Sequence, residues 1–444
     1  MQNAQKSLLE RLFMEIKRDF YLKKLVERMN NGLIKVVTGI RRCGKSYLLN
    51  TLFYHHLIES GVDEQHIIRF AFDSAEDLLK IGEDIVQLEK EGRGVDPKKF
   101  MGYISSCIVD DGRYYLLLDE IQRLDCFVAV LNGYLYNEKL DVYVTGSNAK
   151  LLSKDVATEF AGRGDEVHLH PLSFAEFMSV YKGDRYMGLS EYMLYGGIPL
   201  VVLRENSNDK AALLRNLFTE IYIKDIQKRN KIRNVSELED LMNILSSSIG
   251  SLTNPEKLRK TFKSVKNSNI TSSTIKKYID SLEDSFLIES SVRYDIKGKS
   301  YIETPRKYYF SDIGLRNARI SFRQLEEPHS MENVIFNELI MRGYDVDVGV
   351  VPIVEKADEG RVLRKQLEID FVCNRGSSRL YIQSAYAIPD EEKRNQEIRP
   401  FRRTGDSFKK IVITKDIVTA YYDDYGILTM NIYDFLLDPN SLER

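Results

Sequence analysis

The chain has 444 residues, 43% of them hydrophobic, which is enough apolar material for roughly three domains with cores of their own. Its 64 lysines and arginines nearly balance 66 aspartates and glutamates, so a net charge of -2 excludes a chain that is basic throughout. No run of ~18 apolar residues predicts a membrane span, and four scattered cysteines without a C-x-x-C pair argue against a zinc site or a disulfide framework. We therefore expect a cytoplasmic protein with no membrane partner.

The first predicted strand, "LIKVVT" over residues 33–38, leads into "GIRRCGKS" and then into a predicted helix. In the pattern G-x-x-x-x-G-K-S, main-chain N–H groups surround nucleotide phosphates, the lysine neutralises charge and the serine hydroxyl binds Mg²⁺. ATP is expected instead of GTP because no guanine-specific N-K-x-D motif is present. We predict that Lys45 is also catalytic and that Ser46 binds Mg²⁺. The residues predicted to hold ATP are Gly39, Ile40, Arg41, Arg42, Cys43, Gly44, Lys45, Ser46 and Tyr47.

A second predicted strand ends in two acids, in "YYLLLDE" over residues 114–120. An apolar run of this length indicates a buried parallel strand, and open α/β sheets bind ligands at the carboxyl ends of such strands. Asp119 is therefore predicted to hold Mg²⁺ through water, and Glu120 to polarise the water that attacks the γ-phosphate. The alternative is that the two acids merely end the strand.

A third strand is predicted in "DVYVTGSNA", residues 141–149, which ends with Ser147 and Asn148. We expect Asn148 to be catalytic, by holding the attacking water or contacting the γ-phosphate. Arg163 follows in "EFAGRGDEVH", before another strand. Two roles remain open for Arg163: it stabilises transition-state charge, in its own subunit or a neighbour's, or it forms a surface salt bridge.

The combination "GIRRCGKS", "LLLDEIQ", "VTGSNA", "FAGR", "HPLSFAEF" and "YGGIP" resembles a prokaryotic AAA+-like ATPase family, over nearly the whole chain. Members of that family commonly carry a C-terminal domain called DUF4143, which is similar to PD-(D/E)xK nucleases. The resemblance places Arg163 at the arginine-finger position. It also implies an α/β fold in four parts: a P-loop NTPase core of AAA+ type with a parallel sheet over residues 1–182, a helical lid and connector over 183–234, a winged helix over 235–318, and an α/β nuclease-like domain over 319–444.

In the region after the lid, the sequence predicts three helices followed by a two-stranded hairpin. This is the order of elements in a winged helix. The third helix has an apolar stripe at Ile275, Tyr278, Ile279 and Leu282. This stripe leaves Lys276 and Lys277 outside the buried face, and the hairpin turn adds Lys297 and Lys299. Either the domain places its third helix in the major groove of DNA with the wing near phosphates, or it packs on its neighbours and never meets DNA.

The last region carries acids in the order typical of PD-(D/E)xK nucleases, with Glu332 and Glu338 on a predicted helix and Glu368 and Asp370 on a strand. Such enzymes bind Mg²⁺ through clustered oxygens and use an acid and a lysine on the next strand. In this chain the next strand reads "QSA" at 383–385, with glutamine in place of the acid and alanine in place of the lysine. We therefore expect a nuclease-like fold without cleavage.

These features predict a Mg²⁺-dependent ATPase of AAA+ type that couples nucleotide state to association with double-stranded DNA. Residues 255–277 motivate the DNA partner, because they hold seven lysines and arginines against the single acid Glu256. The alternative is a nucleotide-dependent switch that binds a protein partner and carries an inactive nuclease-like domain. If Arg163 acts on a neighbour's nucleotide, the protein must also form a homo-oligomer.

Overall fold

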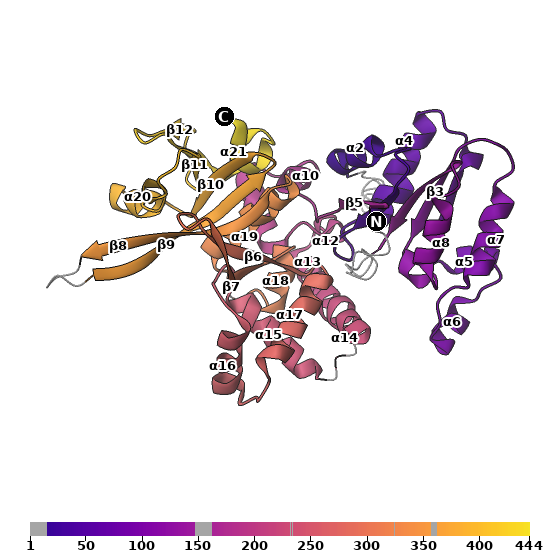
Figure 1. Ribbon diagram of the computed structural model, residues 1–444, viewed down its shortest axis with the longest axis horizontal. Coiled ribbons are helices and arrows are strands. Elements are labelled where there is room, and N and C mark those ends of the chain that lie inside the picture. Colours follow the sequence, from indigo (N-terminus) through magenta and orange to yellow (C-terminus); the bar gives the residue numbers. More distant parts are fainter. Residues whose placement is uncertain (1–15, 147–161, 231, 233, 324, 357–361) are drawn as a thin grey trace. The chain divides into compact units, whose positions relative to one another are not determined.

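A computed structural model describes residues 16–146, 162–230, 232, 234–323, 325–356 and 362–444 (Figure 1). The chain divides into two compact units. The first contains Met1–Pro171 with Asp284–Phe286, and the second contains Leu172–Glu283 with Leu287–Arg444. Across the described ranges, no helix combines the length and the apolar character that crossing a bilayer requires.

The first unit is built on a five-stranded sheet in which all neighbouring strands are parallel. The strands are β1 (Ile34–Thr38), β2 (Ile67–Ala71), β3 (Tyr114–Asp119), β4 (Leu140–Thr145) and β5 (Gly164–His168), in the order β2-β3-β4-β1-β5. β1, β3 and β4 confirm the three strands predicted from the sequence. Because parallel strands share one carboxyl edge, the segments that follow these three strands lie at the same edge of the sheet.

Helices cover both faces of this sheet (Figure 1). The helices are α2 (Asp19–Glu27), the continuous α3 (Lys45–Tyr47), η1 (Leu48–Phe53) and α4 (Tyr54–Glu59), then η2 (Glu64–His66), α5 (Ala75–Lys80), α6 (Ile85–Glu91), α7 (Pro97–Cys107), η3 (Ile121–Arg123) and α8 (Phe127–Tyr134). One core joins Val36 and Val144 of the strands to Phe100 of α7. On the opposite face, the ring of Tyr143 lies 4.5 Å from that of Phe53 in η1. Alternate strand residues therefore point to opposite faces, as a sheet buried on both sides requires.

The second unit contains helices before, between and after its strands. They are α10 (Phe174–Met178), α11 (Arg185–Tyr195), α12 (Pro199–Val202), α13 (Ser207–Asn216), η5 (Leu217–Ile223), α14 (Lys224–Asn230), α15 (Val235–Ser247), α16 (Pro255–Lys266), α17 (Ser272–Asp284), α18 (Ile313–Arg319), α19 (Glu327–Met341), α20 (Glu391–Ile398), η7 (Phe401–Arg403), α21 (Ile432–Leu437) and η8 (Ser441–Glu443). α15, α16 and α17 are the three helices predicted before the hairpin. The stripe of Ile275, Tyr278, Ile279 and Leu282 is buried, as predicted.

The glycines of "YGGIP" are required by close packing against the segment that precedes α18. A Cβ atom on Gly196, whose φ is +73°, would lie 2.3 Å from Oδ1 of Asp312. The buried Asp312 carboxylate accepts hydrogen bonds from the N–H groups of Gly197 at 2.7 Å and Leu315 at 3.0 Å. The motif therefore has a structural role, because it joins the end of α11 to the start of α18.

An eight-stranded mixed sheet completes the second unit. Its strands are β6 (Ile288–Asp295), β7 (Ser300–Phe310), β8 (Asp345–Lys356), β9 (Val362–Arg375), β10 (Ser378–Ala385), β11 (Lys409–Thr414), β12 (Tyr421–Tyr422) and β13 (Ile427–Asn431), in the order β12-β13-β11-β10-β9-β8-β6-β7. β6 and β7 form the predicted antiparallel hairpin. β6 also pairs in parallel with β8, so the hairpin and the last region share one sheet, a connection that the sequence did not predict.

Candidate functional site

The segment between β1 and α3 has the backbone of a loop that only glycine permits at two points. Gly39 has a φ of +137°, and a Cβ atom there would lie 2.1 Å from the carbonyl oxygen of Leu169. Gly44 has a φ of +104° and directly precedes α3. The G-x-x-x-x-G spacing thus places glycine where the chain turns out of the sheet and where it enters the helix.

The loop closes around the amine of Lys45, which is 5% exposed. Its Nζ donates hydrogen bonds to the carbonyl oxygens of Gly39 at 2.9 Å and Ile40 at 3.1 Å. Ser46 is exposed at the start of the helix, whereas Cys43, within the loop, is buried. A positive charge and the first N–H groups of a helix therefore lie at the same end of β1, an arrangement that attracts an anion.

Arg18, a residue that the motif did not reveal, stabilises this loop by hydrogen bonds. It is buried at the start of α2, and its guanidinium donates to the carbonyl oxygens of Cys43 at 3.2 Å and His170 at 2.7 Å. The main-chain N–H of His170 in turn donates to the hydroxyl of Tyr21 at 3.3 Å. Arg18 therefore joins the loop to the segment after β5, and only the fold brings these two segments together.

The two predicted acids lie at the end of β3, at the same sheet edge as the loop. β4 separates β1 from β3, and its last residue, the buried Thr145, organises both acids. The Thr145 hydroxyl donates to the carboxylate of the buried Asp119 and accepts from the main-chain N–H of Glu120 at 3.1 Å. Thr145 was also missed by sequence reasoning, although it directly precedes the predicted Ser147 and Asn148 segment.

Glu120 has an environment suited to a carboxylate that handles protons. Burial raises the pKa of its side chain; the positive charge of Lys45 opposes that rise, while the negative charges of Asp119 and Asp73 add to it. Its backbone is left-handed, with φ +54°, and its side chain accepts a hydrogen bond from Gln122. The structure therefore brings Lys45, Asp119 and Glu120 within electrostatic reach of one another. Asp73, which follows β2, is a further acid that no motif indicated.

The remaining predicted residues of this site lie elsewhere or are not described. Ser147 and Asn148 fall outside the described residues. Arg163 is exposed and precedes β5, and its carbonyl oxygen accepts from the N–H of Ile34 at 2.9 Å. Arg163 therefore lies at the edge where β1 begins, about 13 Å of strand away from the loop. The contact of Arg163 with a phosphate stays a prediction.

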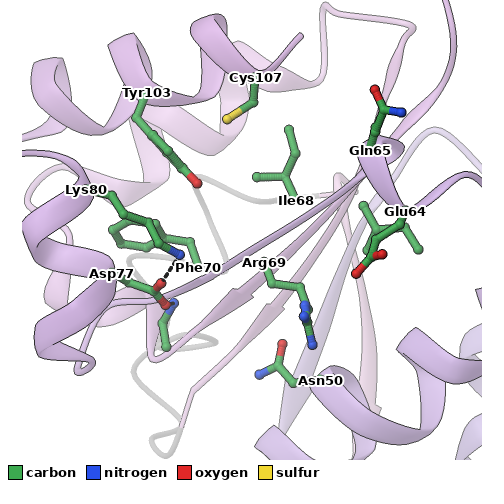
Figure 2. Close-up of a pocket in the computed structure, with 12 residues that line it drawn as sticks. Asn50, Glu64, Gln65, Ile68, Arg69, Phe70, Asp77, Lys80, Tyr103 and Cys107 are labelled. Atoms are coloured by element: carbon green, nitrogen blue, oxygen red, sulfur yellow. Dashed lines mark hydrogen bonds and ion pairs between the residues drawn. The ribbon is translucent and has the colours of Figure 1, made fainter.

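A separate cavity of about 580 Å³ lies along β2 (Figure 2). Asn50, Arg69, Tyr103 and Cys107 are among the residues that line it, and the Asp77–Lys80 ion pair closes one side. None of the twelve lining residues belongs to the 39–46 loop or to the acid pair after β3. The cavity is therefore distinct from the predicted nucleotide site.

In the second unit, the structure brings three of the four predicted acids together. Glu332 of α19 and Glu368 and Asp370 of β9 all contact one lysine side chain. Glu338 does not join them, because its buried carboxylate pairs with Arg342 at 2.7 Å one turn along the same helix. Sequence order alone could not distinguish Glu332 from Glu338, since both lie on inward-facing positions of α19.

The lysines of the predicted winged helix differ in their surroundings. Lys260, Lys263, Lys276 and Lys277 on α16 and α17 are exposed, and within the described ranges no ion pair involves their amines. In the hairpin turn, by contrast, Lys297 donates to the carbonyl oxygen of Pro352 in β8 at 2.9 Å. On α16, however, Arg259 and Lys266 pair with Glu256 and Asp240, so part of the positive charge is engaged in the helices as well as in the wing.

Comparison with known proteins places this geometry in a family. A model described as an AAA domain matches residues 31–178. An uncharacterized protein of Haemophilus influenzae is 34% identical over 433 residues, which cover 95% of this chain and 98% of that protein. The chain belongs to the family of that protein and carries an AAA domain. An uncharacterized protein of Methanocaldococcus jannaschii is also similar to this AAA-domain protein, with 28% identity over 94% of this chain and 88% of that one.

Two further similarities are observed. The Walker-type ATPase of Pyrococcus abyssi is 15% identical, with a TM-score of 0.49, and covers 69% of this chain and 96% of that chain. A second family model, described as a domain of unknown function (DUF8612), matches residues 187–326. That range holds α11 to α18 with the β6–β7 hairpin. The DUF4143 domain expected over 319–444 is not confirmed.

Proposed function

We propose that this AAA-domain protein is a Mg²⁺-dependent ATPase whose nucleotide state controls its association with double-stranded DNA. One observation carries the ATPase proposal: the buried amine of Lys45 and the acids Asp119 and Glu120 gather at one carboxyl edge of the sheet. An electropositive loop that lies beside a buried acid pair favours a bound triphosphate and the activation of water next to it.

In this proposal each part of the loop makes a different contact with the nucleotide. The main-chain N–H groups of 39–46 hold the phosphates, and Tyr47 continues the same first turn of helix. The Lys45 amine leaves the carbonyl oxygens of Gly39 and Ile40, to which it now donates, and turns to the phosphate charge. Arg18 holds the loop in place through its hydrogen bond to the carbonyl oxygen of Cys43. Nucleotide therefore competes with internal hydrogen bonds of the loop, and this competition is the physical basis for a change of loop state.

Ser46 and Asp119 fit Mg²⁺, because a hydroxyl and a single carboxylate are hard oxygen donors and the ion keeps several of its own waters. The bound ion would supply charge neutralisation at the phosphates. Glu120 then orients the attacking water and receives its proton, a role suited to a carboxyl whose pKa is raised by burial. Thr145 positions both acids, and Asn148 is proposed to hold the attacking water.

Arg163 is proposed to act on a neighbouring subunit. Its place at the edge where the strands begin puts it about 13 Å from the loop of its own chain, so a phosphate contact requires a second copy. The proposal therefore includes a homo-oligomer in which one protomer offers Arg163 to the nucleotide of the next. Subunit mixing tests this: an Arg163→Ala chain and a Lys45→Ala chain should recover part of the activity when they are combined.

The DNA part of the proposal rests on α16 and α17. The exposed amines of Lys276 and Lys277 lie near the start of α17, the third helix of the proposed winged helix over 235–318. Each phosphate that a lysine neutralises adds about 0.9 to the slope of log affinity against log salt. We expect Lys276→Ala/Lys277→Ala to lower that slope by about 2. Lys90→Ala/Lys98→Ala, which removes two exposed lysines of the first unit, should leave it unchanged.

For the remaining parts, we propose that the AAA+ core spans 1–182, that 183–234 forms a lid and connector, and that 319–444 is a nuclease-like domain without cleavage. The convergence of Glu332, Glu368 and Asp370 supports the nuclease-like assignment. A second function, a nucleotide-dependent switch for a protein partner, is favoured by the hairpin turn, whose Lys297 is bound to Pro352 instead of facing a ligand.

The central experiment is phosphate release by wild type and Lys45→Ala, with and without duplex DNA. The proposal expects turnover that requires Mg²⁺, that falls to background in Lys45→Ala, and that duplex DNA stimulates. Lys90→Ala, which changes an exposed lysine of the same unit, should behave as wild type. Turnover without DNA stimulation, together with a partner protein retained only with ATP, would select the switch. No ATP affinity by calorimetry would reject both.

A further inference from the structure

A buried lysine lies at the centre of the acid cluster in the second unit. Lys307 belongs to β7 and is 3% exposed. Its Nζ lies 2.8 Å from Oε1 of Glu332, 2.7 Å from Oε1 of Glu368 and 3.6 Å from Oδ1 of Asp370. Three elements that are distant in the sequence, β7, α19 and β9, therefore meet on one ammonium group.

The carboxylate oxygens of this cluster have further partners. The hydroxyl of Tyr309 donates to Oε1 of Glu332 at 2.6 Å, and His329 lies 3.6 Å from its Oε2. The main-chain N–H of Ser384 donates to Oδ2 of Asp370 at 2.9 Å. Glu368 differs from the other two acids, because its side chain is 40% exposed. The cluster is thus closed on the protein side by hydrogen bonds and open to solvent beside Glu368.

The cluster does not fit the Mg²⁺ ion that a nuclease-like domain implies. Oxygen ligands of Mg²⁺ lie at about 2.0–2.1 Å from the ion, whereas the carboxylates here are spaced for hydrogen bonds to a nitrogen. Within the described ranges, no three histidine, cysteine, aspartate or glutamate side chains are arranged to hold a metal ion. The strand after β9 offers Gln383 and Ala385 where another acid and a lysine would complete a metal site.

We propose that Lys307 is the permanent cation of this centre: its ammonium takes the place of a divalent metal and joins the β6–β7 hairpin to the terminal sheet. The amine neutralises part of the charge of Glu332, Glu368 and Asp370, which would otherwise repel one another across the buried space. Because Lys307 is covalently part of β7, the hairpin of the proposed winged helix is held to α19 and β9 whatever the metal content of the solution.

A consequence follows for a chain that lacks the amine. Lys307→Ala removes the amine around which the three carboxylates are spaced, so that they can close on a divalent cation, which prefers oxygen donors. A buried charge without its partner is strongly destabilising. The variant should therefore be less stable than wild type in chelator and should regain stability when a divalent cation replaces the lost charge.

The test uses nucleotide-free full-length protein, with MnCl₂ and TbCl₃ as probes. For Lys307→Ala we expect Mn²⁺ at a hundred-fold excess over its Kd to raise the melting temperature by about 5 °C. We also expect terbium luminescence sensitised through Tyr309, whose hydroxyl contacts Glu332. Wild type should show neither effect beyond that of an Asp370→Asn chain, because its cation is already in place.

Two matched variants separate the proposal from general loss of stability. Lys307→Ala/Asp370→Asn removes one ligand and should lose the Mn²⁺ rescue. Lys35→Ala removes another fully buried lysine, one that pairs with the single carboxylate of Asp141, and should be destabilised without rescue. Mn²⁺ binding to wild type that Asp370→Asn abolishes would overturn the proposal, and so would a folded Lys307→Ala chain that gains no affinity for Mn²⁺ or Tb³⁺.

Discussion

Replacing Thr145 by valine tests how the acid pair is organised. Valine keeps the β-branched shape of threonine and removes only the hydroxyl, so the buried packing at the end of β4 is preserved. Two hydrogen bonds are lost: the one that the hydroxyl donates to Asp119, and the one that it accepts from the N–H of Glu120 at 3.1 Å. Because Thr145 and Asp119 are both buried, restoring either bond with another partner would require rearrangement.

The magnitude follows from the type of each bond. A hydrogen bond to a charged carboxylate contributes about 1.5–3 kcal/mol, and a neutral amide bond about 1 kcal/mol. If the contribution to Asp119 is fully expressed in the transition state, turnover should fall about 10- to 150-fold, since each 1.36 kcal/mol is a factor of ten. Loss of the hydrogen bond from the Glu120 N–H should lower the free energy of unfolding.

The assay is phosphate release at saturating ATP across a Mg²⁺ titration, for wild type, Thr145→Val and Thr145→Ser. Thr145→Val should need more Mg²⁺ and turn over more slowly, while Thr145→Ser, which retains the hydroxyl, should stay within a few-fold of wild type. Thermal unfolding and ATP calorimetry report whether each variant is folded and still binds nucleotide. A folded Thr145→Val chain with wild-type turnover and unchanged Mg²⁺ dependence would refute the reasoning, as would equal damage in both variants.

Three further predictions address the loop and the second unit. Gly39→Ala should abolish ATP binding in calorimetry while the second unit keeps its unfolding transition, because the methyl group would lie 2.1 Å from the carbonyl oxygen of Leu169 at a φ of +137°. Arg18→Met, which keeps side-chain length but loses both carbonyl contacts, should weaken ATP affinity about tenfold or more; unchanged affinity would show that the loop holds itself. Burial raises the pKa of Asp312 to about 6, so the folded state retains a proton that the unfolded chain releases near pH 4. This group therefore makes unit two less stable by about 3 kcal/mol as pH rises from about 4 to about 6, and Asp312→Asn should remove that part of the pH dependence in chemical denaturation; an unaltered slope would contradict it.

Local patterns explain why much of the nucleotide site was predictable. The glycines at positions 39 and 44 indicate two positive φ angles. The apolar runs of β1 and β3 indicate strands that are buried on both faces. Each of these signals depends on neighbours within a few residues. The same holds for α17, where the apolar stripe by itself located Lys276 and Lys277 on the exposed side. The positions of strands and of the loop could therefore be read without the fold.

What the sequence determined by itself is the chemistry that follows each strand: a phosphate loop after β1 and two acids after β3. Only the tertiary structure decided which side chains complete those sites. Strand order puts Thr145 between loop and acids, and parallel register moves Arg163 to the far edge. Lys307 of β7 contacts Glu332 of α19 and Asp370 of β9, which belong to later elements of the chain. The physical reason is that spacing along a chain encodes backbone geometry, whereas a contact between distant side chains depends on how sheets and helices pack, which no local pattern records.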